Sequence, residues 1–168
     1  MSVMGPDLIG RLLDQHAAAL MLYARQWCGA PEDIVQEAVL KLIAQKKPPD
    51  NMVAWLFRVV RNAAISAARA DQRRRYHESA AAAQIEPWFT NSGEARLDVE
   101  SATAALGSLP IEQREIIVAH IWGGLSFEEI APVAGVSSST AHRWYLAGLS
   151  SLRERLGVPW PNKPPIPS

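Results

Sequence analysis

Cysteine is nearly absent from this sequence: Cys28 is the single one among 168 residues. One thiol excludes an intrachain disulfide and a thiolate metal cluster, and it fits a reducing cytoplasm. Long apolar runs are also missing, because the longest near the N-terminus, residues 17–24, is far too short to span a membrane. No basic segment followed by an apolar run marks a signal peptide. We therefore expect a cytoplasmic protein without membrane insertion.

Catalytic and metal-binding patterns are missing as well. The four histidines are scattered, without an HxxxH or HExxH spacing. No GxSxG motif, phosphate-binding glycine loop or pair of carboxylates stands out. The sequence predicts no catalytic residue, no metal site and no cofactor, so we expect a protein that is not an enzyme.

The sequence carries no excess of either charge, with 17 basic and 17 acidic residues. A net charge of zero argues against a freestanding protein that coats nucleic acid by bulk electrostatics. The charge is unevenly spread, however: six arginines lie between residues 58 and 77, against the single acid Asp71. A hydrophobic content of 48% provides enough apolar mass for a globular core.

Residues 126–156 have the pattern of a helix-turn-helix. Ser126 and Glu129 form a capping box, which predicts that a helix begins at the residue after Ser126. Gly135 suits the turn because glycine tolerates positive φ, and Ser137 caps a second, longer helix. An ordinary helical hairpin with a polar outer face remains the alternative for this stretch.

The second helix of this pair separates into a core face and an outer face. Helical periodicity assigns to the core face Ala141, Tyr145, Gly148, Leu149, Leu152 and Leu156. The first turns of a recognition helix approach base edges, and hydroxyl and N–H groups meet phosphates. The candidate DNA-contacting residues are Ser137, Ser138, Ser139, Thr140, His142, Arg143 and Trp144.

The first half of the chain predicts amphipathic helices over residues 7–28, 31–46 and 52–73. On the second of these helices, the polar face carries an apolar residue at its centre. That face holds Asp33, Gln36, Glu37 and Ala44, with Leu40 in its middle. Its leucine fits a lone surface residue and the anchor of a protein-docking surface equally well.

The third helix carries a tryptophan and several arginines on one face. The members of this face that suit DNA contact are Trp55, Arg58, Asn62, Arg69 and Arg73. Such a face fits melted DNA, because an aromatic ring stacks on an unpaired base while guanidinium groups follow the phosphates. The alternative is a Trp55 partly buried against the preceding helix and arginines that are simply solvated.

Composition changes after the arginine run, and residues 78–93 have no sustained period. Beyond them, helices are expected over residues 94–107 and 110–121, with Glu112 and Glu115 near the positive end of the latter. The predicted fold is all-α, with two small helical domains joined by a flexible linker. The predicted boundaries are 1–77 for the first domain, 78–93 for the linker, 94–157 for the second domain and 158–168 for a Pro-rich tail.

Three motifs in this order resemble the bacterial RNA polymerase sigma factors of the extracytoplasmic-function (ECF) type. They are PEDIVQEAVLKL, AWLFRVVRNAAISAARADQRRR and the long run from LPIEQREIIV to LSSLRERL. The resemblance implies a three-helix sigma-two-like domain and a four-helix sigma-four-like domain. It also implies that the 33–40 face contacts core polymerase and that the Trp55 face lies near the melted minus-ten element. The loop KKPPDN resembles the family's base-capturing loop, which makes Asn51 a further candidate.

Two departures from the family pattern stand out. His142-Arg143-Trp144 replaces the usual basic run of the recognition helix, so base preference at the minus-thirty-five element cannot be transferred. Gly123-Gly124 replaces the usual Glu-Gly before the helix-turn-helix.

The function that the resemblance implies is a sigma factor that directs core RNA polymerase to promoter DNA and initiates transcription. Its partners would be core polymerase and promoter DNA, with an anti-sigma factor as a further partner that the family allows. The alternatives are a freestanding helix-turn-helix regulator and a helical adaptor without DNA contact.

Overall fold

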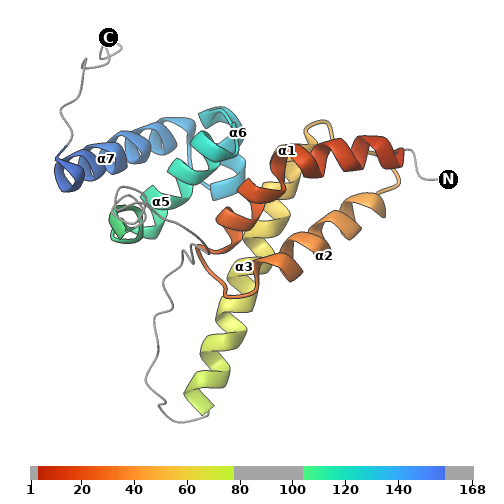
Figure 1. Ribbon diagram of the computed structural model, residues 1–168, viewed down its shortest axis with the longest axis horizontal. Coiled ribbons are helices and arrows are strands. Elements are labelled where there is room, and N and C mark those ends of the chain that lie inside the picture. The colour runs from red at the N-terminus through yellow and green to blue at the C-terminus, as the bar shows by residue number, and fades with distance from the viewer. Residues whose placement is uncertain (1–3, 78–103, 158–168) are drawn as a thin grey trace, which may run out of the picture.

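A computed structural model describes residues 4–77 and 104–157, and every regular element in these ranges is helical (Figure 1). The predicted linker, the predicted tail and most of the helix expected over residues 94–107 lie outside the described residues. Residues 104–107 are helical, in agreement with the end of that expected helix.

The first half forms α1 (Pro6–Ala24), α2 (Pro31–Ile43) and α3 (Met52–His77). The expected ends of α1 and α2 were too late in the chain. In both cases the last turn tightens: Gln26 donates its N–H to the Tyr23 carbonyl oxygen at 3.2 Å, an i to i−3 bond that ends the α-helical pattern.

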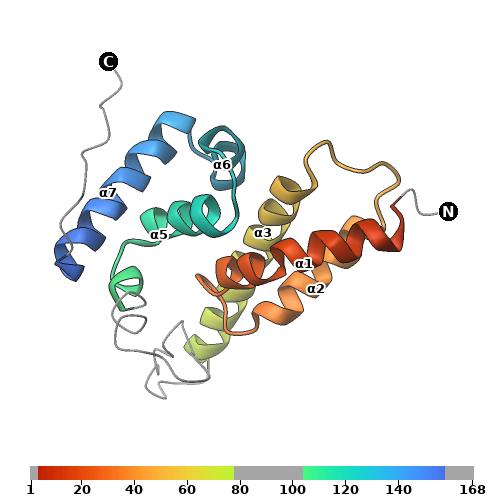
Figure 2. The ribbon, with the colours of Figure 1, turned by 45° about the horizontal axis from the view of Figure 1, so that its top comes forward.

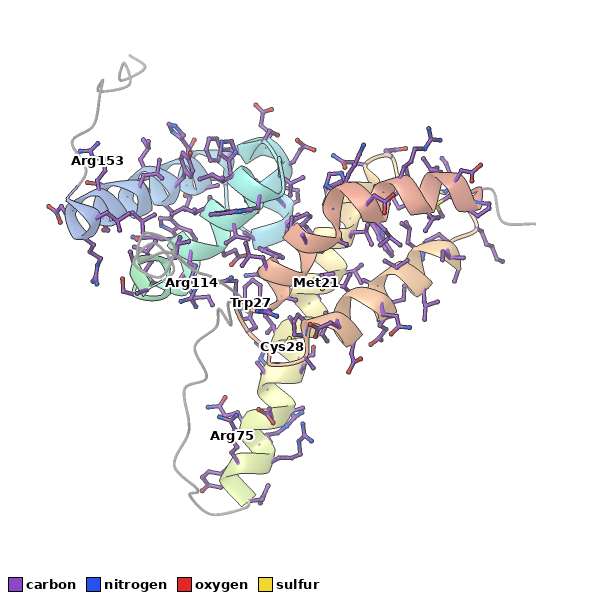
Figure 3. All side chains as sticks on the ribbon, in the orientation of Figure 1. Met21, Trp27, Cys28, Arg75, Arg114 and Arg153 are labelled. Atoms are coloured by element: carbon purple, nitrogen blue, oxygen red, sulfur yellow. The ribbon has the colours of Figure 1, made fainter. Side chains whose placement is uncertain are left out.

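The helix α3 is longer than expected and runs to His77. Asp71 supports its final turns, because this carboxylate pairs with Arg74 at 3.4 Å and with Arg75 at 3.2 Å, three and four residues further on. Figure 3 shows Arg75 on the end of α3 that projects away from the other helices.

The second half contains α5 (Ile111–Ile117), the π-helix η1 (Val118–Trp122), α6 (Phe127–Ala134) and α7 (Ser138–Leu156). The π-helix was not expected from the sequence, which predicted one continuous helix. Gly123 closes this wide turn by donating its N–H to the Val118 carbonyl oxygen at 3.1 Å, and Gly124 follows with φ of 68°.

The two halves of the chain pack against each other and share one hydrophobic core, a contact that the sequence did not predict. The first half contributes Tyr23, Leu42, Phe57 and Val60, and the second half contributes Ile116, Val118, Leu125 and Ile130. A smaller cluster of Leu106, Leu109 and Ile117 packs under Tyr145 and Leu152 of α7. Figure 2 shows the C-terminal helices lying beside the upper part of α3 and one end of α1.

Candidate DNA and polymerase contact surfaces

The helix-turn-helix forms as the sequence predicts. Ser126 accepts a hydrogen bond from the N–H of Glu129 at 3.2 Å, and the Glu129 carboxylate accepts the N–H of Ser126 at 3.0 Å. Hydrogen bonds to the Glu129 carboxylate, first from the Ser126 backbone N–H and then from the Ser126 side chain, lower the pKa of Glu129. Gly135 takes φ of 71° at the turn, and Ser137 caps α7 by accepting the N–H of Thr140 at 3.1 Å. The capping box, the turn glycine and the second cap are therefore confirmed.

The first turns of α7 present hydroxyls and one guanidinium. Ser137, Ser139 and Arg143 are exposed, and Ser138 and Thr140 are half-buried. The Thr140 hydroxyl oxygen lies 2.9 Å from the Ser137 hydroxyl and 3.4 Å from Nη2 of Arg143. This chain of side chains holds the guanidinium near the helix N-terminus, where a recognition helix meets a DNA groove.

His142 and Trp144, candidates for DNA contact at the flanks of the outer face, are half-buried. The His142 ring meets Phe127 edge-on with ring centroids 4.9 Å apart, and Phe127 in turn stacks on His120 at 4.4 Å. Trp144 is half-buried and packs on the shared core. Both rings are fixed by packing within the domain, and their DNA contacts stay predictions. Leu156, assigned to the core face, is 38% exposed at the end of α7.

The α3 face brings most of its predicted DNA contacts to the surface. Arg58, Asn62, Arg69 and Arg73 are exposed. Trp55 is half-buried and packs on the core, as in the alternative weighed from the sequence. Asn51 is exposed and caps α3, because its Oδ1 accepts the N–H of Ala54 at 3.0 Å.

The polymerase face predicted on α2 is exposed throughout, and its leucine is 59% exposed. Leu40 borders an open apolar groove of 280 Å³ between α1 and α2, which Leu13, Met21 and Val39 also line. Glu37 is paired with Lys41 at 3.1 Å. An exposed leucine beside an apolar groove and flanked by acids has the chemistry of a protein-docking surface.

A buried polar cluster joins the two halves of the chain and was not predicted from the sequence. Glu115, expected near a helix N-terminus, is 4% exposed and accepts a hydrogen bond from the Tyr23 hydroxyl at 2.7 Å. Arg61 forms an ion pair with the same carboxylate, and its guanidinium lies 5.5 Å from the Trp27 ring centroid. The only signal in the sequence was an acid directly before the apolar run 116–119.

The surroundings of this cluster shift two pKa values. Burial, reinforced by the negative charge of Glu115, raises the pKa of Tyr23 well above its usual 10.0. Burial alone would lower the pKa of Arg61, but the hydrogen bond and charge of Glu115 raise it. The cluster therefore holds a neutral phenol, a carboxylate and a guanidinium in one buried site.

The remaining chemistry of the described residues is sparse. Burial raises the pKa of the Cys28 thiol, which disfavours a reactive thiolate. Within residues 4–77 and 104–157, no group of three or more His, Cys, Asp or Glu side chains is placed to hold a metal ion. No helix in these two ranges is long and apolar enough to cross a membrane.

The family comparisons agree with this architecture. Residues 12–74 match the model of Sigma-70 region 2, and residues 100–152 match the model of Sigma-70 region 4, so the two models together cover more than half of the chain. The first match contains the helices with the two predicted contact faces, and the second contains the helix-turn-helix.

Two curated relatives of the chain are described as RNA polymerase sigma factors. The chain is 34% identical over 113 residues to the ECF RNA polymerase sigma factor EcfG of Rhodopseudomonas palustris, covering 65% of this chain and 61% of that protein. It is 29% identical over 150 residues to the probable RNA polymerase sigma factor RfaY of Xanthomonas campestris, covering 82% of this chain and 37% of that protein. The chain thus spans less than two thirds of the length of both relatives.

Two solved structures share the fold. The sigma factor RpoE of Bartonella quintana, solved in complex with the anti-sigma factor NepR, aligns with a TM-score of 0.73 and 26% identity, covering 89% of this chain and 96% of that one. CnrH, solved with the cytosolic domain of CnrY, aligns with a TM-score of 0.61 and 23% identity, covering 93% and 92% of the two chains. At that identity, the second match supports the fold alone.

Fold and surfaces together define an all-α, two-domain protein with a C-terminal helix-turn-helix. The chain belongs to the ECF sigma factors of the sigma-70 family.

Proposed function

We propose that this protein is a promoter-specificity subunit that directs core RNA polymerase to two promoter elements. The observation that carries the proposal is that each predicted DNA-contact surface lies in a part of the chain that matches a sigma-70 region. The exposed arginine face of α3 lies in the sigma-70 region 2 match, and the capped recognition helix α7 lies in the region 4 match. The role is that of a non-enzymatic initiation factor, which acts in the cytoplasm where polymerase is found.

The proposed division of labour follows the three surfaces. The α2 face around Leu40 binds core polymerase, α3 with Asn51 and Arg58 reads the melted minus-ten element, and α7 with Arg143 reads the minus-thirty-five element. We also propose the domain boundaries 1–77 and 94–157, which these surfaces respect. Two tethered readers raise each other's effective concentration, so each DNA contact can be weak by itself.

An anti-sigma factor is a further proposed partner. Support comes from the relative from Bartonella quintana, which was solved in complex with an anti-sigma factor and aligns over 89% of this chain. Co-purification of the full chain with a candidate anti-sigma protein, followed by loss of polymerase binding, would test this partner.

The central experiment is run-off transcription with purified bacterial core polymerase and the full chain on a genomic DNA library. The proposal predicts transcripts that start at a shared promoter pattern and that require the chain. Tight binding of the chain alone, as a dimer, to palindromic sites would contradict it and would favour a freestanding helix-turn-helix regulator.

Two variants with matched controls separate the roles. Leu40→Ala should weaken polymerase association while promoter choice is kept, and Leu8→Ala, an apolar residue exposed by 38% on α1, should not. Arg143→Ala should weaken minus-thirty-five dependence by about 1–3 kcal/mol if the guanidinium reads a base through two hydrogen bonds. Arg155→Ala, exposed at the far end of the same helix, is its control. Equal loss of polymerase binding in the Leu40 and Arg143 variants would contradict this division.

A further inference from the structure

Helix α7 carries a large apolar residue on its outer face. Leu146 is 42% exposed and was not among the DNA-contact candidates derived from the sequence. In two views α7 lies at the edge of the molecule with α5 on its inner side (Figures 1 and 2). The buried Gly148 faces that inner side, where it lies against Ile117 of α5. A single leucine on a surface needs no explanation by itself, so its neighbours decide whether it has a role.

Leu146 shares its face of α7 with the predicted base-reading residue Arg143. Residues three apart are neighbours on a helix surface, and they are separated by about 4.5 Å along the helix axis. Both side chains are exposed, and the guanidinium of Arg143 lies 3.4 Å from the Thr140 hydroxyl. Successive bases along a DNA strand are about 3.4 Å apart. A helix in the major groove would therefore place these two side chains against neighbouring base pairs.

The other exposed residues around this pair have short side chains. They are Ser139, Ala147 and Ser150. Short side chains let the helix backbone approach the floor of the major groove, which is about 12 Å wide and admits a helix about 10–12 Å across. At that depth a leucine, which is shorter than an arginine, also reaches the base edges.

The charge of α7 indicates which kind of partner this face fits. Residues 138–153 contain no acid, and they contain the basic residues His142, Arg143 and Arg153. The helix dipole adds positive potential at the N-terminal end, near Arg143. A positive surface of this kind attracts phosphates. The exposed Leu40 of α2, by contrast, is flanked by acids, so the two leucines suit different partners.

We propose that Leu146 is a specificity-determining residue that contacts the methyl group of a thymine, next to the base pair that Arg143 reads. This methyl group is the apolar feature of the major groove, and apolar side chains contact it. Arg143 supplies donors for a guanine, whose O6 and N7 accept two hydrogen bonds. The pair thus selects guanine and thymine on neighbouring base pairs. The inference rests on the proposed function, because it concerns the promoter element assigned to α7.

Uracil tests the contact, because it pairs as thymine does and lacks the methyl group. Holoenzyme is formed from core polymerase and the full chain, and run-off transcription is measured at limiting DNA on a promoter recovered from the library. Synthetic promoter fragments carry uracil in place of one thymine of the minus-thirty-five element at a time. We expect one position at which uracil weakens promoter use by about fourfold, the effect of one buried methyl group.

The variant Leu146→Ala should lose this sensitivity, so that thymine and uracil at the responsive position give equal rates. Leu146→Met keeps an apolar side chain and should keep the difference. The matched control is Leu156→Ala, because Leu156 is 38% exposed on the same helix and lies roughly 15 Å further along. This control should also keep the difference. Far-UV circular dichroism checks that the variants keep their helices, and their affinity for core polymerase should equal that of wild type.

A second probe separates the two side chains. A deaza analogue of guanine, which lacks the N7 acceptor, replaces the guanine beside the responsive thymine. Arg143→Ala should abolish the effect of this analogue and keep the effect of uracil, whereas Leu146→Ala should do the reverse. Such a reciprocal pattern assigns each side chain to its own base pair.

Equal sensitivity to uracil in wild type and Leu146→Ala would overturn the inference. A minus-thirty-five element without a thymine beside the base that responds to Arg143 would overturn it as well. Weaker binding of core polymerase by Leu146→Ala, with the uracil effect kept, would assign the leucine to a protein contact instead. Absence of transcription by the wild-type chain would reject the proposed function itself, whereas transcription that depends on Arg143 and ignores the methyl group would reject only the role of Leu146.

Discussion

Replacing Tyr23 by phenylalanine tests the buried network with the smallest possible change. The substitution removes one hydroxyl from a side chain that is fully buried and leaves its ring contacts with Trp27 and Phe57 in place. The lost bond is 2.7 Å long and ends on the Glu115 side chain, which also forms an ion pair with Arg61. A hydrogen bond to a charged group contributes about 1.5–3 kcal/mol, and Arg61 still pairs with Glu115, so we expect the free energy of unfolding to fall by about 2 kcal/mol.

The assay is urea unfolding followed by far-UV circular dichroism, with Tyr76→Phe as the control. Tyr76 is 86% exposed, so removal of its hydroxyl should change the free energy of unfolding by less than about 0.5 kcal/mol. The same denaturant slope in both variants would assign the midpoint shift to stability. Equal midpoints for the two variants would refute the reasoning, because they would mean that the hydrogen bond from the Tyr23 hydroxyl to Glu115 adds nothing to stability.

Three further predictions use the same unfolding assay. Burial raises the pKa of Tyr23, so the neutral phenol contributes its full stability below the usual pKa of 10.0, and this stability is lost as pH rises through the raised pKa. Tyr23→Phe should therefore remove this part of the stability loss at alkaline pH. An unchanged alkaline stability profile in this variant would contradict the assignment. Ser126→Ala removes the capping box of α6 and should destabilise by about 1 kcal/mol, whereas Ser150→Ala at an exposed site of α7 should not. Gly135→Ala forces a side chain into φ of 71° and should destabilise the protein by about 1–2 kcal/mol. Gly10→Ala lies inside α1 with open space around it and should stabilise the protein by about 0.5–1 kcal/mol. Effects of the same sign in the two variants would contradict the left-handed turn at Gly135.

Local features of this protein were predictable because their causes lie within a few residues. The caps at Ser126 and Ser137 and the left-handed glycine at 135 are each set by one turn of backbone, so the helix-turn-helix could be read directly. Apolar periodicity likewise located the helices of the first domain and the exposed α2 face. It did not fix their ends, since a tightened last turn leaves no apolar pattern.

Sequence by itself thus determined the all-α class, the helix-turn-helix and the surfaces with candidate contacts. Only the tertiary structure decided how the two halves meet. Glu115 is 92 residues from Tyr23 and 54 from Arg61, and no local pattern encodes that these three side chains share a buried site. The partial burial of His142, Trp144 and Trp55 was not predictable for the same reason. Periodicity tells which way a side chain points from its own helix, and burial depends on the surface that another helix brings against it.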